Sequence, residues 1–392
     1  MKPRLSRKLS GFGTTIFTEM TKLANERSAI NLAQGFPDFD GPAFVKDAAV
    51  EAIRAGHGQY ARMSGVPALN AALARKYARD YGLAYDGDAE ITVTSGATEA
   101  IFAALQGLCD VGDEVVMFEP FYDSYRASVY MAGAIPRVAT LRTPVPGAGP
   151  GEAWSFDRDA VRALFGPRTR VLLLNSPHNP TGKVFSRDEL AFLAGLCEEH
   201  DVVCLSDEVY EHLVFEGEHI PMATLPGMRG RTVTISSLGK TFSLTGWKIG
   251  WAAAPPDLTF AIRSAHQFVT FATATPLQHA AVAAIEAGPE FYRALTADYR
   301  QKRDLLVGEL ARLGFDVTAP AGTYFVCAGF ARFGYTDDIA FTRHLIEVGV
   351  AVIPPSVFYA HPEHGRSYVR FAFCKREETL RAAVARLEAL KP

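Results

Sequence analysis

The middle of the chain alternates short apolar runs with helical patterns, and this alternation restricts the fold more than any other feature of the sequence. Several runs are apolar throughout, which is typical of strands in a parallel sheet that is covered on both faces. Strand–helix–strand order predicts a doubly wound α/β domain. The runs interpreted as strands cover residues 91–94, 114–118, 171–174, 202–206 and 232–235, and the helical patterns cover residues 98–109 and 187–200.

The pattern changes near residue 289, where a long helical pattern over 289–313 leads into short strands mixed with helices. We interpret this part as a smaller α+β domain, because a chain of 392 residues is too long for one small core. The later strands are expected over 324–327, 350–353 and 368–373, and the later helices over 337–348 and 377–390. The predicted domains are an N-terminal arm, 1–42, which partly joins the small domain, a large domain, 43–288, and a small domain, 289–392.

Composition and charge exclude several classes of function. The net charge of −3 gives no sign of a nucleic-acid or acidic-surface partner. The cysteines are scattered with no CxxC pair, which favours a reducing compartment over a disulfide framework or a structural zinc site. The basic segment 1–10 is not followed by an apolar stretch, and no run approaches the roughly 20 apolar residues that span a bilayer. We therefore expect a cytoplasmic protein without a metal site, a membrane segment or a nucleic-acid partner.

Lys240 follows the predicted strand 232–235 and is flanked by hydroxyl groups and glycine. A lysine held at a strand end in a largely apolar setting can lose its proton and form an imine with an aldehyde. Ser237 and Lys248, nearby in the sequence, have side chains that could hold a phosphate. This combination predicts a site for pyridoxal phosphate (PLP), an aldehyde cofactor that acts as an electron sink in amino-acid chemistry. A lysine taken alone is more often a solvated surface charge, so the assignment depends on the other candidates.

Further candidates also follow predicted strands, where the ligands of open α/β sheets bind. The segment 95–98 turns from strand to helix, and its small residues and free N–H groups suit an anion as well as an ordinary helix cap. Tyr122 has a flat ring that could stack on a pyridine, although core packing is the commoner role of a lone tyrosine. The prolines and glycine of 175–182 form either a plain loop or a stiff turn that fixes the direction of the Asn179 amide.

Charged side chains complete the candidate site. Asp207 follows the predicted strand 202–206, and if strand geometry persists Val209 points to the same face. A carboxylate beside an aliphatic side chain suits a protonated pyridine nitrogen and its ring face, and Tyr210 could donate to the ring oxygen. Arg370 is surrounded in a predicted strand by apolar and aromatic residues. It is therefore either half of an internal ion pair or a fork of donors for a substrate α-carboxylate.

These segments, in this order and spacing, resemble the fold-type I PLP enzymes and, within them, the class I aminotransferases. The resemblance runs from residues 31–39, with the sequence NLAQGFPDF, to Arg370. It is closest to the branch that contains methionine, glutamine and kynurenine aminotransferases. The resemblance implies a mostly parallel sheet of the seven-stranded type between helices, a smaller α+β domain, PLP as the cofactor and a homodimer with shared active sites.

The resemblance also implies how PLP would be held. Lys240 would bind the cofactor aldehyde and shuttle a proton between the substrate Cα and C4′ of the cofactor, while Asp207 would pair with the pyridine nitrogen. Tyr210 and Asn179 would bond to the ring oxygen. The two faces of the ring would contact Tyr122 and Val209. The phosphate would be held by Ala97, Thr98, Ser237 and Lys248, together with Tyr60 from the neighbouring subunit.

The same resemblance implies a substrate site, with departures from the family pattern that bear on specificity. The substrate carboxylate would contact Gly35, Asn179 and Arg370, and its side chain would contact Phe17 and Phe271. Lys248 stands where many relatives have arginine, so its phosphate contact would be a point charge instead of a fork. Phe17 and Ala272 stand where the kynurenine branch has tryptophan and histidine, which weakens a kynurenine assignment. No counterpart is found of the second arginine used for dicarboxylates, so a second carboxylate would be buried unpaired.

We therefore predict a transaminase that moves the α-amino group of a hydrophobic, sulfur-containing or aromatic L-amino acid, methionine first, to a 2-oxo acid. The reaction would alternate between PLP and pyridoxamine phosphate. A PLP-dependent lyase that eliminates a thiol from cysteine conjugates would use the same lysine and is the alternative. A PLP-sensing regulator needs a DNA-binding segment, for which the roughly 30 residues before Asn31 are too few.

Overall fold

The computed structural model describes residues 6–13, 16–143 and 154–390, and a seven-stranded sheet lies at the centre of this part of the chain. Its strands have the order β2-β8-β7-β6-β5-β3-β4. β8 runs antiparallel to β2 and β7, while the other neighbouring pairs are parallel, which confirms the expected α/β class with a mostly parallel sheet. The strands are β2 (Ile91–Ser95), β3 (Glu114–Glu119), β4 (Ile135–Thr140), β5 (Thr169–Asn175), β6 (Val203–Asp207), β7 (Thr232–Ser237) and β8 (Ile249–Ala253).

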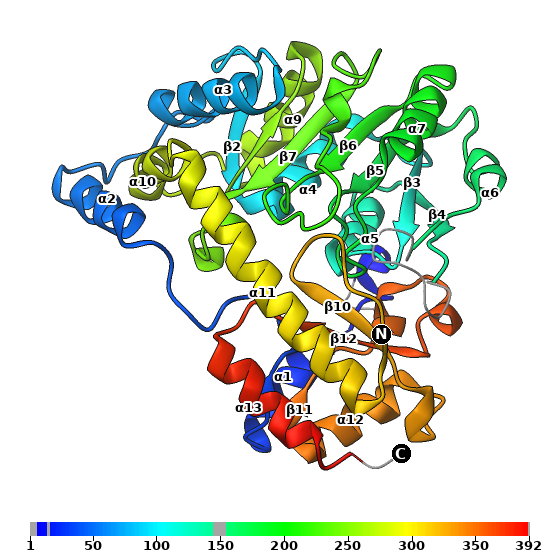
Figure 1. The fold of residues 1–392 in the computed structure, drawn as a ribbon. Helices are drawn as coiled ribbons and strands as arrows, with labels where there is room; N and C mark the ends of the chain where they lie inside the picture. The colour runs from blue at the N-terminus through cyan, green and yellow to red at the C-terminus, as the bar shows by residue number, and fades with distance from the viewer. Residues whose placement is uncertain (1–5, 14–15, 144–153, 391–392) are drawn as a thin grey trace, which may run out of the picture.

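Apolar cores on both faces of this sheet explain the apolar runs of the sequence. In β5, Val171 and Leu173 pack into one core, whereas Leu172 and Leu174 pack into another on the opposite face. The first core includes side chains of α4 (Gly96–Leu108), α5 (Asp123–Met131) and α9 (Pro256–Val269). Two more cores lie against this sheet (Figure 1). One includes side chains of α2 (Ala43–Arg54), α3 (Pro67–Tyr81) and α10 (Thr275–Ile285), and the other includes side chains of α6 (Arg158–Arg162) and α7 (Arg187–Glu199).

The C-terminal part of the molecule is built around α11 (Pro289–Leu313), which Figure 1 shows as a long helix running from beside the large sheet toward α13. A three-stranded antiparallel sheet has the order β12-β10-β9, and β1 pairs with β11 in a two-stranded parallel sheet. These strands pack on α11, α12 and α13 in a core rich in aromatic residues. The remaining elements are α1 (Ile16–Glu26), β1 (Ile30–Asn31), β9 (Asp316–Val317), β10 (Phe325–Gly329), α12 (Asp338–Val348), β11 (Val350–Ala351), β12 (Tyr368–Ala372) and α13 (Glu377–Leu387).

We propose domain boundaries after residues 42 and 288, as the sequence pattern predicts. The pairing of β1 with β11 ties the N-terminal arm to the C-terminal part of the chain. α2 begins at Ala43 and packs with α10 in the core beside the large sheet, and α11 begins at Pro289. Limited proteolysis that released stable fragments with other ends would contradict these boundaries.

The sequence pattern predicts neither β4 nor β8. β4 lies at the edge of the sheet and contains Pro136 and Arg137, so it lacks a continuous apolar run. β8 has glycine and alanine where β-branched residues would mark a strand. A Cβ added to Gly250 would lie only 2.4 Å from the carbonyl carbon of Gly96, so close backbone packing requires a glycine there. The predicted strand 350–353 is also shorter, because β11 ends at Ala351.

Candidate active site

The predicted cofactor residues, apart from Tyr60, line one cavity of about 130 Å³. The cavity lies where β5, β6 and β7 end, which is where an open α/β sheet binds its ligand. The predicted residues that line it are Ala97, Thr98, Tyr122, Asn179, Asp207, Val209, Tyr210, Ser237, Lys240 and Lys248. The lining also includes residues to which the sequence assigns no role of their own, namely Gly96, Tyr125, Asn175, Gly239, Thr245 and Ile249.

A larger cavity of about 310 Å³ elsewhere in the molecule lacks such a convergence of reactive groups. Its buried lysine, Lys183, donates to Glu189 Oε1 at 2.8 Å and to the Trp154 carbonyl at 2.7 Å. These two bonds hold the Lys183 Nζ against the protein, so it is not free to attack a ligand in this cavity. The smaller cavity is therefore the candidate active site.

Asp207 is the buried carboxyl group of this cavity. Burial raises the pKa of Asp207 to about 6, although hydrogen bonds from Tyr125 and the Val209 N–H act in the opposite direction. The Tyr125 hydroxyl donates to Oδ2 at 2.5 Å, and the Val209 N–H donates to Oδ1 at 3.3 Å. Because β6 ends at Asp207, the condition that strand geometry persists to Val209 is not met, and Val209 reaches the cavity from a turn.

Tyr125 is a site residue that sequence reasoning missed. It lies in the first turn of α5, three residues after Tyr122, and residues with this spacing share a helix face. The two ring centres are 5.7 Å apart. The spacing from Tyr122 was therefore a usable signal, but the bond to Asp207 joins distant parts of the chain and leaves no local pattern.

Lys240 lies in the short helix α8 (Leu238–Thr241), directly after β7. Burial lowers the pKa of its ammonium group below the ordinary lysine value, although Cys374 and Asp207 act in the opposite direction. Its Nζ lies 5.7 Å from the centre of the Tyr210 ring and 5.9 Å from the centre of the Tyr324 ring. A lysine with a lowered pKa is more often neutral and can attack an aldehyde.

The first turn of α4 forms a cradle for an anion. Its N-cap residue, Ser95, makes no side-chain bond to the turn, so N–H groups at the start of the helix are available. Gly96 has a φ of +78°, and a Cβ added to it would lie 3.3 Å from Lys248 Nζ. An amine, a carboxyl group and an anion cradle in one cavity match the aldehyde, the pyridine nitrogen and the phosphate of PLP. The residues present therefore fit this cofactor.

Arg370 lies in β12 and is only 1% exposed. One of its terminal nitrogens donates to the Ala33 carbonyl at 2.7 Å, and the other donates to Asn179 Oδ1 at 3.2 Å. Its guanidinium stacks on the Phe325 ring, with 4.1 Å from the central carbon to the ring centre. The bond to Asn179 joins Arg370 to the cavity. Gly35 lies close by, where a Cβ would meet the Phe325 ring at 2.4 Å.

Tyr60 and Phe271 are not among the residues that line the cavity. Tyr60 is 85% exposed, and its ring makes an edge-to-face contact with the half-exposed Phe271, with 5.6 Å between the ring centres. Phe17 belongs to α1, but its side chain lies outside the described residues. In the described ranges, no cluster of His, Cys, Asp and Glu side chains is arranged to hold a metal ion, and no helix is long and apolar enough to cross a membrane.

The sequence model of the family "aminotransferase class I and II" matches residues 27–387. The chain belongs to this family. The aminotransferase is 42% identical to the methionine aminotransferase of Escherichia coli, with 98% of this chain and 97% of that protein covered. It is 38% identical to a kynurenine–oxoglutarate transaminase of Dictyostelium discoideum, with 98% and 96% covered. The solved structure of N-succinyldiaminopimelate aminotransferase from Mycobacterium tuberculosis matches with a TM-score of 0.95 at 44% identity, covering 99% of this chain and 100% of that chain.

These comparisons confirm the predicted fold type, the transaminase class and the dependence on PLP that the class shares. The resemblance to the methionine and kynurenine branch is also confirmed. The three relatives are named for three different substrates. Membership of the family therefore establishes the reaction of this aminotransferase but not its amino donor.

Proposed function

We propose that this aminotransferase takes the α-amino group from a hydrophobic, sulfur-containing or aromatic L-amino acid, with methionine favoured, and passes it to a 2-oxo acid. The residues that line the cavity carry this proposal. Among the described residues that line the cavity, the lysines are Lys240 and Lys248, and there is no arginine. With Arg370 committed to the α-carboxylate, a second carboxylate would lack a cation, at a cost of several kcal/mol when buried. The identity to a methionine aminotransferase supports the same choice.

The proton transfers are assigned to Lys240. When bound, PLP supplies an electron sink that makes the proton on the substrate Cα acidic. We propose that Lys240 Nζ removes this proton and returns one at C4′ of the cofactor, since burial lowers the pKa of the amine. Asp207 keeps a proton on the pyridine nitrogen, and the Tyr125 hydroxyl holds its carboxylate in place. Tyr210 and Asn179 donate to the ring oxygen.

The remaining residues orient the cofactor and the substrate in this proposal. Tyr122 and Val209 form the walls on the two ring faces. Ala97 and Thr98, through their N–H groups, hold the phosphate with Ser237 and Lys248. Arg370 presents two donors to the substrate carboxylate, which also meets Gly35 and Asn179. Phe17 and Phe271 are assigned to the substrate side chain, with Phe271 outside the cavity lining described above.

A substrate profile tests the proposed donor. We expect kcat/KM for methionine to exceed that for aspartate by at least about tenfold, since each 1.4 kcal/mol of unpaired charge corresponds to a factor of ten. Initial rates of 2-oxo acid formation from methionine, phenylalanine, kynurenine, aspartate and N-succinyldiaminopimelate give the comparison. A higher kcat/KM for aspartate or N-succinyldiaminopimelate than for methionine would contradict the proposal. None of the three relatives described above is named as a lyase, so we retain transamination over β-elimination.

We further propose that the aminotransferase is a homodimer in which Tyr60 reaches the phosphate held by the partner. Exposed aromatic side chains support an interface in this region, since Phe268 is 86% exposed on α9 and Tyr60 contacts Phe271. Tyr60→Phe is expected to raise the dissociation constant for PLP about tenfold, the effect of losing one hydrogen bond to a charged group. Titration of PLP-free protein measures this, with Tyr130→Phe as the control on α5. A monomer in sedimentation equilibrium, or an unchanged affinity in Tyr60→Phe, would contradict the shared site.

A cytosolic location is proposed as well. All five cysteines are free in the structure, as expected for a reducing compartment. Cell fractionation that recovered the aminotransferase outside the cytosolic fraction would rule out this location.

A further inference from the structure

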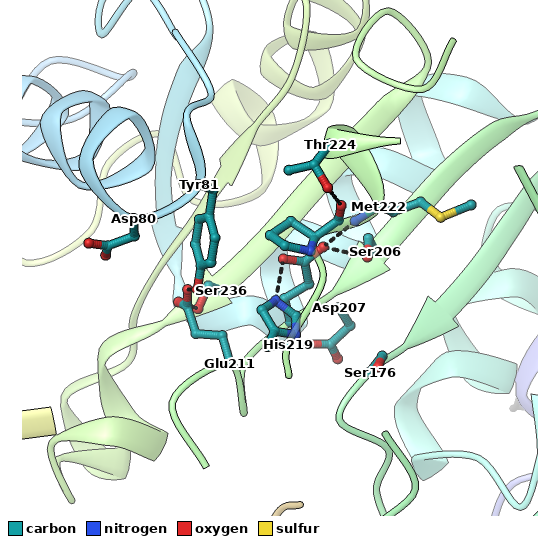
Figure 2. Close-up of polar contacts among 12 residues, drawn as sticks. Asp80, Tyr81, Ser176, Ser206, Asp207, Glu211, His219, Met222, Thr224 and Ser236 are labelled. Carbon is teal, nitrogen blue, oxygen red and sulfur yellow. Dashed lines mark hydrogen bonds and ion pairs between the residues drawn. The ribbon is translucent and has the colours of Figure 1, made fainter. Parts of the chain in front are cut away.

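Two buried glutamates each directly follow a residue of the candidate active site in the sequence. Asp207 and Tyr210 line the cavity, whereas Glu208 and Glu211 are buried outside its lining. Each glutamate accepts hydrogen bonds from more than one element. Figure 2 shows several of the residues involved, among them Tyr81, Ser206, Glu211, His219, Met222 and Ser236. Neither glutamate has a part in the reaction as proposed above, so these networks need another explanation.

Glu208 holds the loop that follows the active-site turn. Its Oε1 accepts from the Ser206 hydroxyl at 2.7 Å and from the Met222 N–H at 3.3 Å, and its Oε2 lies 2.9 Å from His219 Nε2. Figure 2 shows Ser206, His219 and Met222 close to one another. The residue after Asp207 is thereby fixed to β6 itself and to the segment 219–222.

Glu211 connects its own turn to α3 and to β7. Its Oε2 accepts from Lys76 Nζ and from the Tyr81 hydroxyl of α3, both at 2.6 Å, and its Oε1 accepts from the Ser236 hydroxyl of β7 at 2.9 Å. Burial alone would raise the pKa of Glu211, but the Lys76 ammonium lowers it below the ordinary value. Burial raises the pKa of Tyr81, so this hydroxyl stays protonated and donates. Glu211 is therefore a carboxylate that accepts three bonds.

The bond to Ser236 is linked to the cofactor site through the next residue of β7. Ser236 and Ser237 are consecutive in β7, so their side chains point to opposite faces, and Ser237 lines the cavity. On the other side of the same bond, Glu211 directly follows Tyr210. One hydrogen bond thus spans from the residue beside Tyr210 to the residue beside Ser237. Tyr210 is proposed to hold the ring oxygen of PLP, and Ser237 is proposed to hold its phosphate at the opposite side.

We propose that Glu211 is a positioning residue, which fixes the spacing between Tyr210 and Ser237 through its bond to Ser236. This inference rests on the proposed function for the roles of Tyr210 and Ser237. A buried ion pair such as Lys76–Glu211 can often be replaced by apolar residues without loss of stability, so stability alone does not account for the network. The bond between Glu211 and β7 sets the width of the cofactor site.

A matched pair of variants separates positioning from stability. Ser236→Ala removes the bond from Glu211 to β7, and Tyr81→Phe removes a bond to the same carboxylate from α3. Both leave the Lys76–Glu211 ion pair in place, and neither residue lines the cavity. Each loses one hydrogen bond to a charged acceptor, the bond from Ser236 being buried and that from Tyr81 part-buried, so we expect similar decreases in the melting temperature of the PLP-free protein.

Cofactor binding should distinguish the two variants. Ser236→Ala is expected to raise the dissociation constant for PLP about tenfold and to shift the pH midpoint of the visible absorption of the bound cofactor. Tyr81→Phe is expected to leave both values close to those of the wild type. If the wild type binds PLP and Ser236→Ala has the same PLP affinity and the same pH midpoint, this inference is overturned but the proposed function is not. Wild-type protein that took up no PLP would instead overturn the proposed function, and this inference with it.

Discussion

Replacing Lys240 with alanine is expected to abolish transamination while leaving a folded protein. The variant lacks the amine that is proposed to bind the cofactor aldehyde and to move the proton at the substrate Cα. Loss of a proton-transfer group costs about 10²- to 10⁴-fold in rate, and loss of the covalent link adds to this. Among the described residues, the other lysine of the cavity is Lys248, which is committed to the phosphate. We expect kcat with methionine to fall by more than about 10⁴-fold.

The control for this variant is a second buried lysine. Lys183→Met is expected to lower the melting temperature, because the bonds to Glu189 and the Trp154 carbonyl are lost, and to keep its turnover. Rates of 2-oxo acid formation and far-ultraviolet circular dichroism compare the two variants with the wild type. Turnover by folded Lys240→Ala above about 1% of the wild-type rate would contradict the assigned role.

Asp207→Asn is expected to lower kcat while it stabilises the PLP-free protein. An amide cannot hold the pyridine nitrogen in its protonated form by a charge, so the electron sink is weakened. We expect kcat to fall by about 10²- to 10³-fold, the usual effect of losing one preorganised group at a reacting centre. In the variant the Val209 N–H can keep the amide oxygen as its acceptor, and the Tyr125 hydroxyl can turn to accept from the amide NH2, so the fold around position 207 is kept.

The gain in stability follows from the raised pKa of Asp207. Burial raises this pKa from 3.8 to about 6, so the folded PLP-free protein binds more protons than the unfolded chain between these values. Its stability therefore falls as the pH rises from about 4 to about 6, by roughly 2–3 kcal/mol from this group. Asparagine does not titrate, so the melting temperature of Asp207→Asn should exceed that of the wild type at pH 7.5, with a smaller difference at pH 5. A variant that was less stable at pH 7.5, or turned over at the wild-type rate, would contradict this reading.

The cavity could be predicted from the sequence because its residues follow strands. Asp207 is the last residue of β6, and Lys240 and Asn179 follow within four residues of the ends of β7 and β5. The ends of these neighbouring parallel strands meet at one edge of the sheet. The apolar runs marked those strands because each is buried on both faces. The predicted strands and the doubly wound α/β class were therefore enough to place these side chains at one edge of a sheet.

Contacts between distant parts of the chain could not be predicted in this way. Tyr125 bonds to Asp207 across 82 residues of sequence, and Lys76 bonds to Glu211 across 135. Such pairs leave no periodic pattern, because each partner's position is set by its own helix or turn. β8 escaped prediction for a related reason, since its glycine and alanine residues are selected by close packing on α4 and not by strand propensity.

The chemistry inferred for this aminotransferase requires a covalent bond between PLP and the side-chain nitrogen of Lys240. Borohydride reduction of the PLP-loaded enzyme, followed by peptide mapping, tests this bond most directly. We predict a single pyridoxyl-modified peptide, with the modification at Lys240. A modification at another lysine, or none in protein that has bound PLP, would contradict the assignment.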